Sequence, residues 1–127
     1  MFDFGFIDAH CHLADSKLQS ELDDDILKQQ EIVGFISSAL CQSEFNWHQN
    51  NQNPKMYWVA GIHPTYEKSK IEDLSTIIQL CETKQIIGIG EIGLDVRANT
   101  QAYQRKVLLE QLAIAKEFEL PVIFHVV

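Results

Sequence analysis

The sequence has no long hydrophobic run. None of its 127 residues lies in an apolar stretch that approaches the roughly 20 residues of a membrane-spanning helix. The amino-terminal segment MFDFGFIDAHCH carries no basic stretch ahead of an apolar one, so no secretory leader is expected. These absences exclude the common classes of membrane protein and predict a soluble chain without a membrane partner.

Cysteines and basic residues are also scarce. Cys11, Cys41 and Cys81 are widely spaced and form no C-x-x-C pair, which predicts reduced thiols and a cytoplasmic location. Ten Lys and Arg residues against eighteen Asp and Glu residues give a net charge of −8. This balance argues against a broad basic surface for nucleic acid. It leaves open a nucleic acid held at a metal site, because bound divalent ions are large local positive charges.

The apolar content is that of an ordinary folded domain. Apolar residues make up 46% of the chain and charged residues 22%, which suits one packed domain over residues 1–127. Short apolar runs alternate with segments of helical periodicity, without an Asn-Gly or Asp-Gly hairpin signal or an internal repeat. The expected strands are Phe2–Asp8, Ile32–Leu40, Met56–Ile62, Ile86–Gly90 and Pro121–Val127.

The segments between these runs have helical periodicity. The expected helices are Lys17–Glu31, Ile71–Thr83 and Thr100–Glu119, with a shorter one behind Ser43. Nearly continuous apolar strands separated by helices are typical of a parallel sheet buried on both faces, so the fold class is α/β. Periodicity does not decide between an open sheet and a barrel. In the longest helix the face expected to pack inward comprises Tyr103, Val107, Leu108, Leu112, Ala115 and Phe118.

Residues of the metal-binding type stand where four of the five apolar runs end: Asp8, His10, His12, His63, Glu91 and His125. The carboxyl ends of parallel strands meet at one edge of the sheet, where α/β active sites are built. His10 and His12 are two residues apart, so on an extended strand both imidazoles point to the same side. Imidazoles suit ions such as Zn, Mn, Fe or Co, and carboxylates extend the range to Mg.

Each of these residues also has a purely structural explanation. An isolated H-x-H is a common chance match, and Glu91 could pair with Arg97 or Arg105. His63 could begin a turn because a proline follows it, and His125 could be a core histidine. Taken separately, these explanations do not account for the fact that four of the five apolar runs end in residues that can bind metal, all at the same edge of the sheet. The combined pattern therefore favours a metal site.

The glycines of the fourth run have the spacing G-x-G-x-x-G, at Gly88, Gly90 and Gly93. No helix begins directly after them, as a dinucleotide-binding loop would require. Close packing at a strand end explains these glycines better.

Four segments, FIDAHCHL, GIHP, IGIGEIGLD and QLAIAKEFELPVIFH, together resemble the successive motifs of the TatD family of metal-dependent hydrolases. The resemblance runs from Phe2 to the last residue and keeps the order of the motifs. It implies a TIM-type (β/α)8 barrel, of which this chain would form an incomplete part with about five strands. It also implies a deoxyribonuclease that cuts phosphodiester bonds of DNA with two divalent metal ions, Mg, Mn or Zn.

The resemblance implies a metal-binding role for four residues. His10 and His12 would bind one ion, Glu91 would bridge both ions, and His125 would bind the second. Two such ions would lower the pKa of a shared water for in-line attack on phosphorus.

It implies a different role for three further residues. His63 would lie beside the substrate phosphate, which makes Glu91 and His63 the candidate catalytic residues. Asp8 and Asp95 match positions that would support the metal ligands from behind.

The chain departs from the family pattern after His125. Val126 and Val127 stand where the family has a polar turn that contains Arg, and the further His and the acidic T-D-S-P-like stretch of the family do not occur. A (β/α)8 barrel typically needs about 250 residues. A five-stranded part of it would expose a sheet edge and an apolar face, which invites self-association.

Three functions remain open from the sequence. The first is the amino-terminal part of a TatD-like deoxyribonuclease whose activity belongs to the complete protein, so that the chain alone has little or no nuclease activity. The second is a non-catalytic remnant that binds metal without turnover. The third is an amidohydrolase or phosphoesterase barrel that acts on a small molecule. The E-I-G-L-D stretch favours the first over the third.

Overall fold

The structure is a computed structural model that describes residues 5–19 and 31–127. A parallel sheet of five strands in the order β1-β2-β3-β4-β5 forms its centre. Consecutive strands are neighbours throughout, which is the order of a singly wound barrel and not of a doubly wound open sheet. The strands are β1 (Phe6–Cys11), β2 (Ile32–Ala39), β3 (Met56–Ala60), β4 (Ile89–Leu94) and β5 (Val122–Val126).

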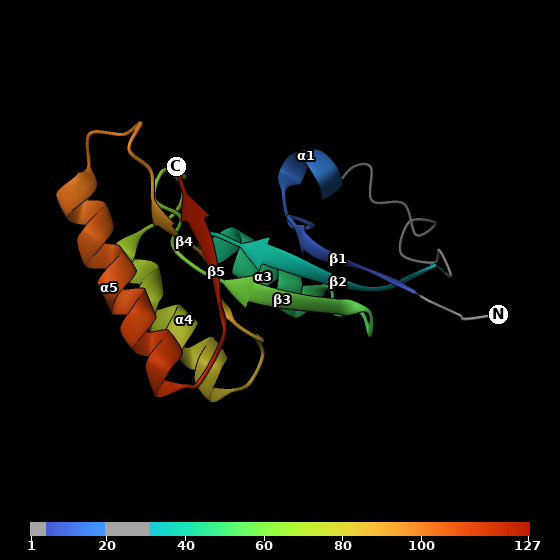
Figure 1. Ribbon diagram of the computed structural model, residues 1–127. Coiled ribbons are helices and arrows are strands. Elements are labelled where there is room, and N and C mark those ends of the chain that lie inside the picture. The colour runs from blue at the N-terminus through green and yellow to red at the C-terminus, as the bar shows by residue number, and fades with distance from the viewer. Residues whose placement is uncertain (1–4, 20–30) are drawn as a thin grey trace.

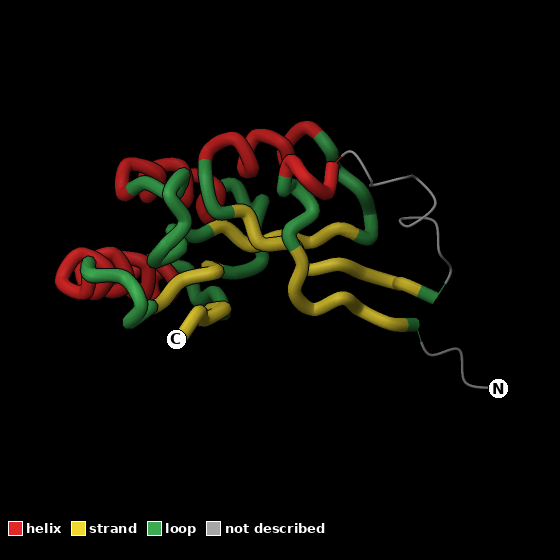
Figure 2. Tube along the Cα trace, turned by 90° about the horizontal axis from the view of Figure 1, so that it is seen from above, coloured by secondary structure: helices red, strands yellow, loops and turns green. Residues whose placement is uncertain are grey.

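The helices cover one side of this sheet (Figures 1 and 2). The sheet curves with the helices on its outer side, as the strands of a barrel do (Figure 2). The expected α/β fold with five parallel strands is therefore confirmed as a half-barrel. The helices are α1 (Ser16–Gln19), α3 (Gln42–Asn50), the 3-10 turn η1 (Ile71–Asp73), α4 (Leu74–Glu82) and α5 (Gln101–Glu117).

Two expected elements extend beyond the described residues. The strand expected from Phe2 is seen from Phe6 onward, and residues 2–4 lie outside the described part. The helix expected over Lys17–Glu31 is seen as α1 up to Gln19, and residues 20–30 lie outside the described part. Glu31, expected as its last residue, lies in a turn. No described helix is long and apolar enough to cross a membrane.

The core lies between the sheet and the helices. Its largest fully buried apolar side chains come from β4 and from helices α3 and α4, and include Ile89, Ile92, Phe45 and Leu80. The face predicted for α5 is confirmed for Val107 and Ala115 as buried residues and for Leu108, Leu112 and Phe118 as residues that pack against the core.

The prediction that Tyr103 faces inward is wrong, because its side chain is 46% exposed. The neighbouring position, Gln104, is buried instead, and so is Gln111 two helical turns later. The amides of both glutamines form hydrogen bonds with backbone groups just after β3 and β4, at Ile62 and Asp95, so these two polar residues occupy the inward face.

Close contact between β4 and β5 explains the glycines of β4. A Cβ atom on Gly90 would lie 2.7 Å from the Cβ of Ile123, and one on Gly93 would collide with the carbonyl oxygen of His125. The prediction that packing accounts for these glycines is confirmed. The strand itself runs on to Leu94, so Glu91 lies within β4 and not after it.

The two edge strands of the sheet are β1 and β5. Large apolar side chains are exposed on both of them: Phe6 is 66% exposed, Ile7 61% and Phe124 56%. The three cysteines, Cys11, Cys41 and Cys81, are free thiols, as expected.

Candidate metal centre

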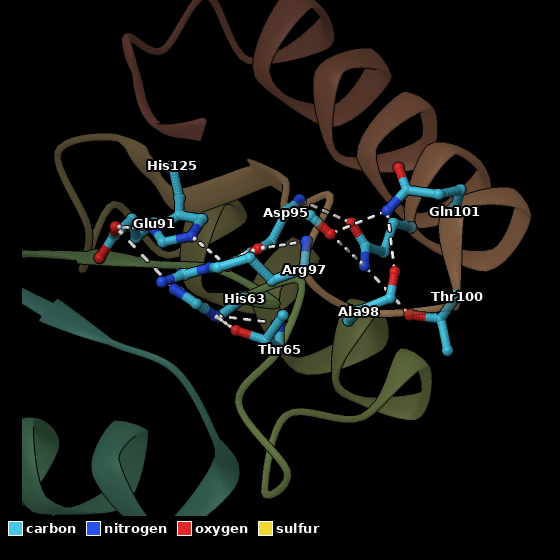
Figure 3. Close-up of polar contacts among 10 residues, drawn as sticks. His63, Thr65, Glu91, Asp95, Arg97, Ala98, Thr100, Gln101 and His125 are labelled. Atoms are coloured by element: carbon cyan, nitrogen blue, oxygen red, sulfur yellow. Dashed lines mark hydrogen bonds and ion pairs between the residues drawn. The ribbon is translucent and has the colours of Figure 1, made fainter. Parts of the chain in front are cut away.

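The Glu91 carboxylate lies at the point where four strand ends meet. Its Oε2 atom is 3.4 Å from His10 Nε2 and 3.7 Å from His12 Nε2. Its Oε1 atom is 3.0 Å from His125 Nδ1 and 3.9 Å from His63 Nε2. Each carboxylate oxygen therefore faces its own pair of imidazoles. Figure 3 shows Glu91 beside the His125 and His63 rings, with an interaction to each.

Irregular strand pairing directs Glu91 toward this point. Gly90 pairs with Ile123 and Ile92 pairs with Phe124, so Glu91 is an extra residue in β4 without a partner in β5. Such a bulge removes a residue from the ladder and re-aims its side chain, and bulges are common next to active sites.

A second irregularity lies in β1, beside His10. Asp8 pairs with Phe35 and Cys11 with Ser37, so three residues of β1 oppose two of β2. Both bulges stand next to a candidate ligand, and neither can be deduced from the hydrophobic pattern because register depends on the neighbouring strand.

The donor atoms form two groups that suit divalent ions. His10, His12 and Glu91 form one, and His63, Glu91 and His125 form the other, and in each the ligand atoms lie within 4.8 Å of one another. Nitrogen and oxygen ligands bind zinc at about 2.0–2.2 Å, so two ligands of one ion are about 3–4 Å apart. The distances from Glu91 to His10, His12 and His125 fall in this range, so these residues fit a bound ion on each side of the carboxylate.

His63 has a defined protonation state. The backbone N–H of Thr65 donates to His63 Nδ1 at 3.1 Å, so this nitrogen is an acceptor. Burial, followed by the neighbouring His125, lowers the pKa of His63, which favours the neutral ring. A neutral ring with an acceptor at Nδ1 carries its hydrogen on Nε2, the atom that faces Glu91. An N–H group donates a hydrogen bond and cannot coordinate a cation.

His125 has the opposite arrangement. Its Nε2 lies 3.1 Å from Asp95 Oδ2 and its Nδ1 faces Glu91 (Figure 3). Asp95 is 1% exposed, and the hydrogen bonds from Arg97 hold the pKa of its carboxyl well below the usual range. Glu91 Oε1 lies 3.0 Å from the other ring nitrogen, Nδ1, so His125 stands between two carboxylates. With an ion bound at Nδ1, the hydrogen of the ring would be on Nε2 and would be donated to Asp95, the usual arrangement of a metal-binding histidine and the carboxylate behind it.

Arg97 therefore has a different partner from the one considered from the sequence. Its backbone N–H and Nε–H donate to Asp95 Oδ1 at 3.0 and 2.9 Å. The only described ion pair of Arg97 is with Asp95, so the interpretation of Glu91 as a structural partner of Arg97 is not supported.

Asp8 and Ser38 lie next to His10. The carboxylate of Asp8 accepts a hydrogen bond from the backbone N–H of His10 at 3.2 Å, so it contacts the strand and not the imidazole. Ser38 Oγ lies 3.4 Å from His10 Nδ1, which leaves Nε2 toward Glu91. Ser38 was not identified from the sequence, because a serine in an apolar strand carries no spacing signal.

A cavity of about 280 Å³ opens beside this centre. Its wall includes His12, His63 and Glu91 on one side and Glu44 and Tyr66 on the other. Burial and the nearby Glu44 raise the pKa of Tyr66 to about 12, and the neutral phenol donates to Glu44 Oε1 at 3.2 Å. The cavity leaves room for a small group next to the imidazoles, and its wall also carries the Asp15 carboxylate.

The fifth histidine, His48, lies away from the centre. Its side chain is 1% exposed, stacks on Trp58 at a ring distance of 4.8 Å and has its Nε2 3.0 Å from Ser37 Oγ. This is the one histidine that the sequence pattern did not place at a strand end.

Comparison with known proteins finds a matching family and relatives that are named as nucleases. The family described as TatD related DNase matches residues 7–127. The chain is 38% identical over 133 residues to a 3'-5' ssDNA/RNA exonuclease TatD of Pantoea ananatis, covering 98% of this chain and 49% of that protein. It is 27% identical over 141 residues to the human deoxyribonuclease TATDN3, covering 95% of this chain and 52% of that protein.

Solved structures agree in fold. The TatD homologue YjjV of Escherichia coli superposes with a TM-score of 0.81 at 28% identity, over 98% of this chain and 51% of that one. The chain thus spans about half the length of the curated relatives it matches. With its motifs, half-barrel and histidine–carboxylate centre, the chain belongs to the family of TatD related DNases.

Proposed function

We propose that this chain is the part of a two-ion phosphodiesterase that supplies the histidines and the bridging carboxylate, and that the enzyme acts on DNA. The observation that carries the proposal is the position of Glu91. Its two oxygens face different imidazole pairs, which is the arrangement of a carboxylate shared by two ions.

Four residues would hold the ions. His10 and His12 would bind one ion through their Nε2 atoms, and His125 would bind the other through Nδ1, with Glu91 between them. Bound divalent ions supply activation of water and neutralisation of the phosphate charge. Asp95 keeps the His125 hydrogen on the far side of the ring, so that the lone pair remains directed at the centre.

His63 would act on the substrate and not on an ion. Its Nε2–H points into the centre, where it can donate to a non-bridging phosphate oxygen. This donor would orient the diester while water adds to phosphorus and one P–O ester bond breaks. This proposal keeps Glu91 and His63 as the catalytic residues predicted from the sequence, because both side chains face the centre.

The substrate class follows from the relatives and the charge. Relatives are named as a deoxyribonuclease and as an ssDNA/RNA exonuclease. A chain of net charge −8 is poorly suited to bind a polyanion through its general surface, so binding would depend on the ions and a few local donors.

A second function is binding of ions without turnover. The observation that favours it is that the chain covers 52% and 49% of the length of the two relatives described above, so groups needed for turnover would lie in the remainder. The activity of the first proposal would then belong to a protein of the relatives' full length, and the chain alone would cleave weakly or not at all.

One experiment on the purified chain tests the metal centre and the activity of the chain alone. Binding of Mn²⁺ is measured by calorimetry, and cleavage of a labelled single-stranded DNA is measured with Mg²⁺ or Mn²⁺, for the wild type, His10→Ala and the control His48→Gln. We expect Mn²⁺ binding that His10→Ala weakens and His48→Gln preserves, with little cleavage. Absence of Mn²⁺ binding contradicts the metal centre, and strong cleavage abolished by His10→Ala contradicts the assignment of activity to the longer protein.

A further inference from the structure

Helix α5 carries two buried glutamines on one face. Gln104 is 2% exposed and Gln111 is fully buried. They are seven residues apart, which places both side chains on the same side of the helix two turns apart. An apolar side chain would pack at either position without needing hydrogen bonds, so the amides require an explanation.

Gln111 forms two hydrogen bonds with the backbone of one residue, Ile62, which follows β3. Its Oε1 accepts from the N–H of Ile62 at 2.6 Å, and its Nε2 donates to the carbonyl of Ile62 at 3.1 Å. Two contacts fix both the position and the rotation of that residue. The next residue along the chain is His63, whose Nε2–H faces the centre.

Gln104 repeats the arrangement at the end of β4. Its Oε1 accepts from the N–H of Asp95 at 2.7 Å, and its Nε2 lies 3.2 Å from the Asp95 carbonyl and 3.0 Å from Thr100 Oγ1. The Asp95 carboxylate in turn lies 3.1 Å from His125 Nε2 (Figure 3). The amide therefore holds the residue that orients a candidate metal ligand.

We propose that Gln104 and Gln111 are positioning residues of the metal centre, through which α5 sets the placement of the Asp95–His125 pair and of His63 separately. Neither glutamine touches the centre itself. That the centre binds metal rests on the proposed function. The contacts of the two glutamines with the backbone of Ile62 and Asp95 do not depend on it.

The two positions make different predictions. Gln104 acts through a metal ligand, so its loss should weaken ion binding. Gln111 acts through His63, which donates and does not coordinate, so its loss should displace the His63 ring and leave ion affinity nearly unchanged. If the glutamines only filled space in the core, the two substitutions would not differ in their effects on ion affinity and on the His63 ring.

The test compares Gln104→Met and Gln111→Met, which keep the side-chain volume and remove the amide, with Gln79→Met at an exposed position of α4. Ring-nitrogen NMR signals of ¹⁵N-labelled histidines are recorded without added ion, and Mn²⁺ affinity is then measured by calorimetry. Gln104→Glu and Gln111→Glu keep the acceptor for the backbone N–H, so they serve if a Met variant does not fold, with a smaller change expected at the same histidine.

We expect Gln111→Met to shift the signals of His63 and to change Mn²⁺ affinity by less than about twofold. We expect Gln104→Met to shift the signals of His125 and to weaken Mn²⁺ binding about tenfold or more, as loss of a ligand's supporting partner does. His48, which lies away from the centre, should keep its signals in both.

The proposal is overturned if both variants lower the thermal midpoint while His63 and His125 keep their wild-type signals. It is also overturned if both variants shift all histidines alike, because that is general loosening. If the wild type binds no Mn²⁺, the proposed function fails, but the ion-free ring signals still decide whether the glutamines position His63 and His125.

Discussion

The backbone N–H of Thr65 donates to His63 Nδ1 at 3.1 Å and thereby fixes the hydrogen of this imidazole on Nε2. A contact between residues two apart in the chain thus decides what His63 can do at the centre. It can donate to an anion, and it cannot coordinate a cation unless this contact breaks.

Replacing His63 should separate phosphate binding from ion binding. We expect His63→Ala to leave the number of bound Mn²⁺ ions unchanged and to weaken binding of a dinucleotide in the presence of Mn²⁺ about 10- to 100-fold, because a hydrogen bond to a charged group contributes about 1.5–3 kcal/mol. Calorimetry gives both quantities. Thr65→Ala keeps the backbone N–H donor and removes only the 3.4 Å contact of the Thr65 hydroxyl with the same nitrogen, so it should weaken dinucleotide binding far less than His63→Ala does. Loss of one bound ion in His63→Ala would identify His63 as a ligand instead.

Acid should destabilise the chain through His48. Burial lowers the pKa of His48 to about 4, against an ordinary value of about 6.5. Between these pH values the unfolded chain binds a proton that the folded chain excludes, so stability falls as the pH falls from about 6.5 to about 4. His63, whose pKa burial also lowers, contributes in the same direction.

The measurement is the urea midpoint at about pH 7, 5.5 and 4.5, which spans this range. His48→Phe keeps an aromatic ring against Trp58 and removes the titrating group, so the midpoint should fall less with acid than in the wild type. An equally steep fall in His48→Phe would show that His48 does not carry this pH dependence.

The exposed strand edges should make the isolated chain self-associate. Phe6 and Ile7 lie on β1, whose outer edge has no partner strand within the described residues. Exposed apolar strands at a sheet edge pair readily with other chains. We expect sedimentation to show concentration-dependent association at micromolar levels, reduced by Ile7→Lys.

The matched control for that experiment is Tyr103→Lys, at an exposed position of α5 far from β1 in sequence. This variant should associate as the wild type does. A sharp monomer peak for the unaltered chain, with a cooperative thermal transition, would contradict the prediction.

The sequence was sufficient for the fold class and for the expectation that the candidate ligands lie close together. Parallel strands place their carboxyl ends at one edge, so the position of His10, Glu91 and His125 after or within apolar runs was enough to predict that they converge. Strand ends were less predictable. The bulges beside His10 and Glu91 depend on pairing with β2 and β5, which local periodicity does not contain.

The supporting contacts were the least predictable. Gln104 and Gln111 were not recognised because a polar residue on an amphipathic helix normally faces solvent. Their seven-residue spacing on an otherwise apolar face was the signal that could have identified them. Their partners, the backbone groups of Ile62 and Asp95, are 49 and 9 residues away and become neighbours only when the sheet forms.

The most direct test of the shared carboxylate is the number of Mn²⁺ ions bound per chain in the wild type and in Glu91→Gln, followed by calorimetry and by the magnetic coupling of bound Mn²⁺ pairs. If Glu91 bridges two ions, the wild type binds two coupled ions and Glu91→Gln weakens both sites together, whereas His10→Ala weakens one of them. Loss of a single ion in Glu91→Gln, with the other bound at wild-type affinity, would contradict a shared carboxylate.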